Sequence, residues 1–176
     1  RQRQMCIRDR VYVETAEGNP VKVGLEMLSP AKKLADKVTA VVIGGGVADA
    51  AKEVAKAGAD QVICVDSEDY KEFNLDAYAQ VLVELVKEEN PEAVFVGGTQ
   101  DGKDIAPVVA AKCNTGCASD VLDIKAEDGE VIYTCPLYGG TVLEDVKIKT
   151  TPQIATLRSG AFQKVEDPTA VSYTHL

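Results

Sequence analysis

The sequence predicts an α/β fold, in which a parallel sheet carries helices on both faces and antiparallel strands near the C-terminus extend it. Three observations support this prediction. Residues 38–44, 61–66 and 93–98 form short runs that are almost wholly apolar, which is typical of strands covered on both faces. A segment with helical spacing of apolar residues follows each run. After Asn114 the pattern changes to strands and turns without helices.

Each element has its own signal. Ser29 is the expected N-cap of the first helix, and Pro30 takes its first position. Asn74 is the expected N-cap of the long helix at 74–90, and Pro91 ends that helix. Asp128-Gly129 predicts a tight hairpin turn. In chain order we expect strand 11–15, helix 28–37, strand 38–44, helix 47–58, strand 61–66, helix 74–90, strand 93–98, helix 102–113 and a late strand at 153–159.

Charge and composition exclude several classes of function. The formal net charge is -9, although residues 1–10 contribute +3 from four arginines and one aspartate. A chain this acidic repels a phosphate backbone, and aromatics make up only 5 % of it, so we expect no nucleic-acid partner. No apolar run approaches the roughly 20 residues of a membrane span. Five irregularly spaced cysteines indicate reduced thiols and a cytoplasmic protein.

The single histidine, His175, lies in the terminal tail. Nucleophilic triads and dyads need an imidazole within the fold, so we expect no catalytic residues and a protein that is not itself an enzyme. Cys113 and Cys117 have a C-x3-C spacing that invites a metal site. No second pair of ligands accompanies them, so we expect no metal.

Two glycine loops follow predicted strands, at Gly44, Gly45 and Gly46 and at Gly97, Gly98 and Thr99. In a parallel sheet ligands bind at this edge, and a glycine loop that opens a helix can hold a phosphate. The alternative is that these glycines only make tight turns. Asp101 and Asp104 favour the second interpretation, because carboxylates there would occupy the helix end and repel a phosphate.

The two ends differ in composition from the interior. Both "RQRQMCIRDR" and "VSYTHL" resemble peptides translated from sequencing-adapter DNA, although natural disordered termini are the alternative. We therefore expect residues 1–10 to be non-native, residues 11–165 to form the domain, and residues 166–176 to combine the start of a linker with a non-native tail. On this interpretation the natural chain continues past Asp167.

Two blocks of sequence resemble the α subunit of electron transfer flavoprotein. The first, "GGTQDGKDIAPVVAAKCNTGCASDVLDI", is similar to the family's small-residue loop, G-[RK]-D-[LI]-A-P, Ala-rich helix and [AS]-D strand start. The second, "YGGTVLEDVKIKTTPQIATLRSGAF", is similar to its G-G, P-Q-[MI]-A-T-[VL]-R and phenylalanine. Their order and spacing fit between Val11 and Asp167.

The resemblance implies the N-terminal domain of that subunit, with an adenine-nucleotide-alpha-hydrolase-like, Rossmann-like fold. It implies pairing with a β subunit and an FAD that the complete heterodimer holds and this fragment alone does not. The complex would carry electrons from dehydrogenases, such as acyl-CoA dehydrogenase, to a downstream acceptor. The resemblance also places Arg158 near the partner subunit and its flavin, where a fixed cation can stabilise a reduced flavin; the alternative is an ordinary surface arginine.

A different class of function is also compatible with the residues. The chain could be a stand-alone adenine-nucleotide-binding module resembling universal stress proteins, with both glycine loops in contact with the nucleotide. ATP would then raise the melting temperature of the purified domain, whereas under the first hypothesis a β subunit would do so.

Overall fold

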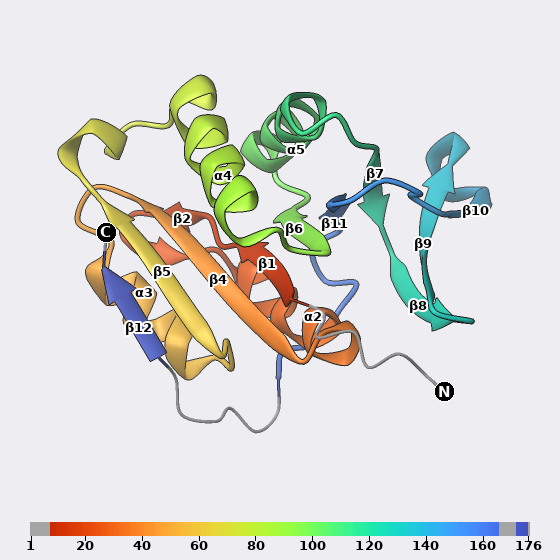
Figure 1. The fold of residues 1–176 in the computed structure, drawn as a ribbon, viewed down its shortest axis with the longest axis horizontal. Coiled ribbons are helices and arrows are strands. Elements are labelled where there is room, and N and C mark those ends of the chain that lie inside the picture. Colours follow the sequence, from red (N-terminus) through yellow and green to blue (C-terminus); the bar gives the residue numbers. More distant parts are fainter. Residues whose placement is uncertain (1–7, 166–171, 176) are drawn as a thin grey trace.

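A seven-stranded parallel sheet forms the centre of the molecule, for which a computed structural model describes residues 8–165 and 172–175 (Figure 1). The strand order is β12-β5-β4-β1-β6-β11-β7, and every neighbouring pair is parallel. The strands are β1 (Arg8–Tyr12), β4 (Lys37–Gly44), β5 (Gln61–Asp66), β6 (Ala93–Gly97), β7 (Cys117–Val121), β11 (Gln153–Leu157) and β12 (Ser172–His175). The predicted α/β class is confirmed.

Helices cover both faces of this sheet. Side chains alternate along β4, so Ala40 and Val42 pack in one core and Val41 and Ile43 in the other. The first core includes α1 (Lys22–Glu26), α2 (Leu28–Leu34) and α3 (Ala48–Lys56), and the second includes α4 (Leu75–Glu89) and α5 (Gln100–Lys112). Short 3-10 turns, η1 (Glu68–Tyr70) and η2 (Tyr138–Gly140), complete the helical elements of the described residues.

The late antiparallel strands form a sheet of their own. Its strands are β8 (Asp123–Glu127), β9 (Glu130–Leu137) and β10 (Val142–Val146), in the order β10-β9-β8, and Asp128-Gly129 makes the predicted hairpin turn. Antiparallel strands follow the parallel core as predicted, but they do not add to its edge. The reason is that β9 buries Tyr133 and Cys135 in the core beside α1–α3, where Tyr133 meets Phe95 edge to face.

The remaining pair, β2 (Thr15–Ala16) and β3 (Asn19–Pro20), forms a small antiparallel ribbon just beyond β1. It lies between β1 and α1 and begins at the last residue of the predicted strand 11–15.

The helix caps agree only in part with the prediction. Asn74 does cap α4, because its side chain accepts a hydrogen bond from the backbone N–H of Ala77 at 3.1 Å. The assignment of Ser29 as an N-cap is wrong. The unpredicted helix α1 ends at Glu26, only Met27 separates it from the start of α2 at Leu28, and no side chain caps α2. Pro30 lies in the first turn of α2, where its missing N–H has no intrahelical partner to lose.

The central strand β1 begins earlier than the predicted strand at 11–15. Both β4 and β6 pair with its backbone as far back as Asp9, so backbone hydrogen bonding carries the strand through charged residues. Asp9 and Arg10 are consequently buried, at 2 % and 3 % exposure. Arg10 forms an ion pair with Glu89 at 2.5 Å. Residues 1–7 lie outside the described residues, and the non-native origin of residues 1–10 stays a prediction.

Candidate functional site

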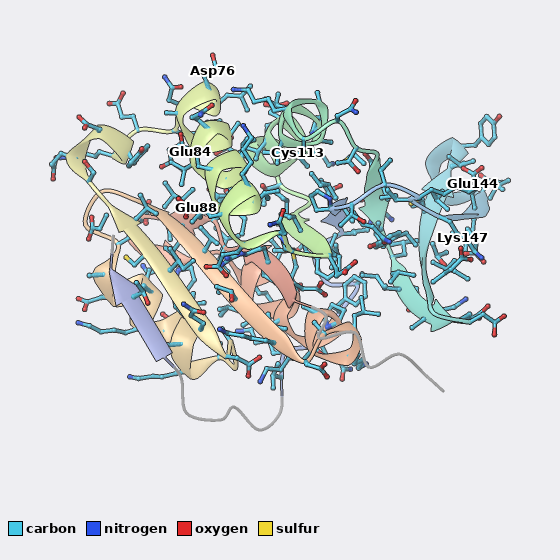
Figure 2. The ribbon with its side chains drawn as sticks, viewed as in Figure 1. Asp76, Glu84, Glu88, Cys113, Glu144 and Lys147 are labelled. Atoms are coloured by element: carbon cyan, nitrogen blue, oxygen red, sulfur yellow. The ribbon has the colours of Figure 1, made fainter. Side chains whose placement is uncertain are left out.

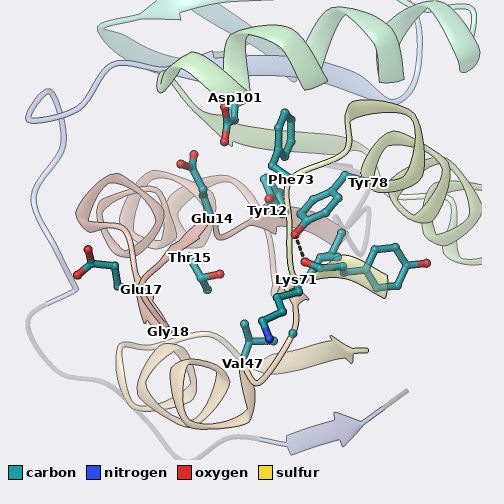
Figure 3. Close-up of a pocket in the computed structure, with 14 residues that line it drawn as sticks. Tyr12, Glu14, Thr15, Glu17, Gly18, Val47, Lys71, Phe73, Tyr78 and Asp101 are labelled. Carbon is teal, nitrogen blue, oxygen red and sulfur yellow. Dashed lines mark hydrogen bonds between the residues drawn. The ribbon is translucent and has the colours of Figure 1, made fainter. Parts of the chain in front are cut away.

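The two glycine loops lie on either side of the carboxyl end of β1. The chain runs from β1 to β4 and β5 on one side and then crosses to β6 on the other, which makes this edge a topological switch point. A pocket of about 200 Å³ opens there (Figure 3). The residues that line this switch-point pocket are Tyr12, Glu14, Thr15, Glu17, Gly18, Ile43, Gly44, Gly45, Val47, Tyr70, Lys71, Phe73, Tyr78 and Asp101.

Acidic side chains dominate the charge of the switch-point pocket. Glu14, Glu17 and Asp101 line it against a single cation, Lys71, and Figure 3 shows Glu14 and Asp101 facing the same space. Burial raises the pKa of Glu14, the hydrogen bond from Thr99 lowers it, and Asp101 raises it further. An anion entering this pocket would lose hydration without gaining a positive field.

Two of the three glycines in the first loop pack against the protein's own atoms. A Cβ on Gly44 would lie 2.6 Å from Cγ1 of Val47, and one on Gly45 would lie 3.1 Å from Cα of Lys71. The backbone N–H of Gly46 donates to Oδ1 of Asp66 at 2.6 Å. A carboxylate of the chain therefore accepts the N–H that a phosphate could otherwise use.

The second loop shows the same internal packing. A Cβ on Gly97 would lie 2.7 Å from Cγ1 of Val23, and one on Gly98 would lie 2.9 Å from the carbonyl oxygen of Leu157. These close approaches explain why glycine is needed at both positions, with no need for a bound ligand.

Thr99, not an aspartate, caps the helix that follows. Helix α5 begins at Gln100, two residues before the predicted start, and the Thr99 hydroxyl oxygen accepts a hydrogen bond from the N–H of Gly102 at 3.0 Å. The same hydroxyl donates to Glu14 at 2.5 Å. The expectation that Asp101 and Asp104 satisfy the helix end is thus corrected, because a threonine at the N-cap position reaches the free N–H directly.

Arg158 lies elsewhere, just after β11. Its guanidinium binds Asp120 through two hydrogen bonds, with Nε donating to Oδ1 at 2.9 Å and the terminal amino group NH2 to Oδ2. These bonds hold the pKa of Asp120 below its usual range. The Arg158 side chain remains 45 % exposed, so it stays accessible from outside the domain.

The backbone around this pair is arranged to hold it. Asp120 has φ of +60°, a left-handed conformation that aspartate adopts more readily than most residues, and its N–H donates to the hydroxyl of Thr156 at 2.8 Å. The shift in register between β7 and β11 falls at this position. No local pattern in the sequence predicts the partnership of Asp120 and Arg158, since only the pairing of β7 with β11 brings together residues 38 positions apart.

A buried carboxylate anchors the loop after Arg158. Glu26 is 3 % exposed, accepts a hydrogen bond from the N–H of Gly160 at 2.8 Å, and pairs with Lys22 at 3.1 Å. Since α1 was not predicted, the sequence offered no signal for this contact.

The two cysteines of the C-x3-C spacing lie near the end of α5 and the start of β7. Burial raises the pKa of both the Cys113 and Cys117 thiols. Within the described residues, no group of three or more His, Cys, Asp or Glu side chains is placed to hold a metal ion. None of the helices in that part of the chain is both long and apolar enough to span a bilayer.

Comparison with known proteins assigns the family. Residues 9–173 match the electron transfer flavoprotein domain, so the chain belongs to the electron transfer flavoprotein family. It is 38 % identical over 162 residues to "Protein FixB" of Clostridium saccharobutylicum, covering 88 % of this chain and 48 % of the relative. It is 36 % identical over 162 residues to the electron transfer flavoprotein subunit alpha of Clostridium acetobutylicum, with the same coverage of 88 % and 48 %.

A third relative is the acryloyl-CoA reductase electron transfer subunit beta of Anaerotignum propionicum, which is 32 % identical over 185 residues, covering 89 % of this chain and 50 % of the relative. The chain thus spans about half the length of the curated relatives it matches. The resemblance to electron transfer flavoprotein α subunits is confirmed.

The family is one of flavoproteins, and the switch-point pocket does not fit FAD. FAD carries a pyrophosphate, whereas this pocket presents three carboxylates and has a volume of about 200 Å³, below the range of about 300–1,000 Å³ usual for cofactor pockets. Both glycine loops that could approach the pyrophosphate are packed against the chain's own atoms. No step of flavin chemistry is therefore assigned to these residues.

Proposed function

We propose that this chain is the N-terminal domain of an electron transfer flavoprotein α subunit. In the cytoplasm it would pair with a β subunit to form an FAD-containing electron carrier. The observation that carries the proposal is the family match across residues 9–173, together with a relative at 36 % identity that is named as an electron transfer flavoprotein subunit alpha. In this proposal residues 11–165 form the domain, and residues 1–10 and part of 166–176 are non-native, which resequencing of the source locus would test.

The role of the domain in the carrier is to dock and to shape the complex. Asp76, Glu84 and Glu88 project from the outer side of α4, which gives that face a negative charge (Figure 2). Charge of one sign on an accessible face steers oppositely charged redox partners and raises their rate of encounter. The donors we propose are dehydrogenases that act on acyl-CoA substrates, since one relative is named as an electron transfer subunit of acryloyl-CoA reductase.

The test uses the complete α subunit expressed with its β subunit. We expect the two to purify together with bound FAD, and the flavin absorbance to bleach when an acyl-CoA dehydrogenase and its substrate are added. If flavin is bound but no such dehydrogenase bleaches it, the proposed electron donors are wrong, while the proposal of an FAD-containing carrier still holds. Failure of the subunits to associate would overturn the proposal itself.

A further inference from the structure

The negative charge of the switch-point pocket lacks a counter-charge among the described residues. Its one cation, Lys71, pairs at 3.5 Å with Glu68, a carboxylate that does not line the pocket. Within the same described residues, no ion pair involves any of the three carboxylates that do line it, Glu14, Glu17 and Asp101. Besides burial, the charge of Asp101 raises the pKa of Glu14, so these two side chains repel each other. A bound cation would relieve that repulsion.

A buried hydroxyl group faces the same space. Tyr12 is 2 % exposed and lines the pocket, where Figure 3 shows it between Glu14 and Tyr78. Burial raises the pKa of this hydroxyl well above its ordinary value, and Tyr78, Glu14 and Asp101, which all line the pocket, raise it further. In the described part of the chain the hydroxyl forms no hydrogen bond. Buried polar groups almost always have a partner, so the expected partner is a polar atom that enters the pocket.

One wall of the pocket is aromatic. The ring of Tyr78 meets Phe73 at a centroid distance of 5.2 Å and Tyr70 at 5.8 Å, both edge to face. The Tyr78 hydroxyl donates to the carbonyl oxygen of Tyr70 at 2.7 Å, which fixes the ring in place. Phe73 is 40 % exposed, so an apolar ring borders the opening. Such a wall attracts both apolar groups and cations, because the faces of aromatic rings carry negative charge density.

The size of the pocket limits what the cation can be. A volume of about 200 Å³ equals that of about six or seven water molecules at about 30 Å³ each, so a ligand with a similar number of non-hydrogen atoms fits. In the residues that the structure describes, no three His, Cys, Asp or Glu side chains are placed to hold a metal ion. The carboxylates and the aromatic wall together therefore favour an organic cation with a short carbon chain.

We propose that the switch-point pocket binds a small aliphatic amine. The ammonium group carries three N–H donors, for which the Glu14 carboxylate, the Asp101 carboxylate and the Tyr12 hydroxyl oxygen are the acceptors. The carbon chain lies against Phe73 and Tyr78. This role goes beyond the proposed function and does not depend on it, because the amine needs neither electron transfer nor subunit pairing in order to bind.

The first experiment titrates putrescine, a short aliphatic diamine, into the complete α subunit in a calorimeter, without and with the β subunit. We expect saturable binding of one molecule per chain in both cases. 1-Aminobutane should bind more weakly because it carries less charge, and neither 1-butanol nor butyrate should bind. The proposal would be overturned by no saturable binding up to about 10 mM putrescine, or by 1-butanol binding as tightly as 1-aminobutane. Binding that disappears when the β subunit is added would also overturn it.

The second experiment removes the negative charge of the pocket. Glu14→Gln/Asp101→Asn keeps the shape of both side chains and should weaken the Kd for putrescine at least about tenfold. The matched control, Glu53→Gln/Glu127→Gln, removes two charges from exposed residues outside the pocket and should leave the Kd unchanged. Equal affinity of the wild type and the Glu14→Gln/Asp101→Asn variant, at matched melting temperatures, would rule out this site.

A third variant separates binding from stability. Tyr12→Phe removes a hydroxyl that has no hydrogen-bond partner among the described residues, so the melting temperature of the free α subunit should not fall. The Kd for putrescine should weaken by about threefold to tenfold, because the ammonium group loses one acceptor. An unchanged Kd, whether or not the melting temperature falls, would show that this hydroxyl does not serve a ligand and would overturn the proposed site.

Discussion

At the scale of single residues, charge is placed where hydrophobic packing alone would not put it. Asp9 is 2 % exposed in the central strand, and neither carboxylate oxygen has a hydrogen bond of good geometry within the described residues. Burial raises the pKa of Asp9 to about 7, the nearby backbone of Ala93 lowers it, and Glu92 raises it. A carboxylate in such a position destabilises the folded chain when it is ionised.

Asp9 should make stability fall with rising pH. Because its folded pKa lies above the unfolded value of 3.8, the protonated form favours folding, and this stability is lost as pH rises to about 7. The expected loss in the free energy of unfolding is about 4 kcal/mol. Asp9→Val should abolish that loss in urea titrations between about pH 4 and 7. The exposed variant Asp104→Asn should keep the wild-type profile; parallel profiles for all three proteins would contradict the assignment.

For Arg158 the family resemblance implies a role near the flavin, whereas the structure shows a role in holding Asp120. Its guanidinium is held on Asp120, yet its side chain is 45 % exposed, so it can serve the domain and a partner together. The family resemblance implies a place for Arg158 near the flavin of the complete heterodimer. We therefore expect Arg158→Gln to shift the flavin midpoint potential to more negative values, because a nearby cation stabilises the reduced, anionic form of a flavin. Arg158→Lys, which keeps the charge, should recover much of the shift in spectroelectrochemical titrations. An unchanged potential in Arg158→Gln would leave the residue with a structural role only.

At the scale of elements, the loop after β6 shows how a phosphate-loop shape can be used internally. Thr99 joins the start of α5 to Glu14, two residues after β1, through one hydroxyl group. The loop therefore ties two neighbouring strands and a helix together at the switch point.

Removing the Thr99 hydroxyl should separate these elements. Thr99→Ala should lower the free energy of unfolding by about 1–2 kcal/mol, as expected for loss of an N-cap. Thr99→Ser keeps both hydrogen bonds and should lie close to wild type. Chemical denaturation of the three proteins measures the difference, and equal losses in both variants would show that the methyl group, not the hydroxyl, is responsible.

At the scale of the whole molecule, the acidic pocket and the filled glycine loops bear on nucleotide binding. A stand-alone nucleotide module would be stabilised by its ligand, because a ligand that binds only the folded state raises the melting temperature. We expect neither ATP nor AMP to raise the melting temperature of the purified chain, and we expect the β subunit to raise that of the complete α subunit. A clear increase with ATP would favour the module resembling universal stress proteins over the carrier.

Local patterns in the sequence were enough to predict much of this protein. Almost wholly apolar runs such as 93–98 are typical of strands buried on both faces, and Asn74 and Asp128-Gly129 carry their own signals for a cap and a turn. The family could also be recognised, because its two motifs are continuous segments of chain. Each of these features depends on residues that are close together in the sequence.

Features built from distant residues needed the tertiary structure. The pair of Asp120 and Arg158 exists only because β7 lies beside β11, and the glycine loops are filled only because Val23 and Leu157 pack against them. Backbone pairing with both neighbouring strands also carried β1 through Asp9 and Arg10, against the preference of their side chains. The strand β9 buries Tyr133 and Cys135 against the parallel sheet, and this packing was decided by the assembled core rather than by any local pattern.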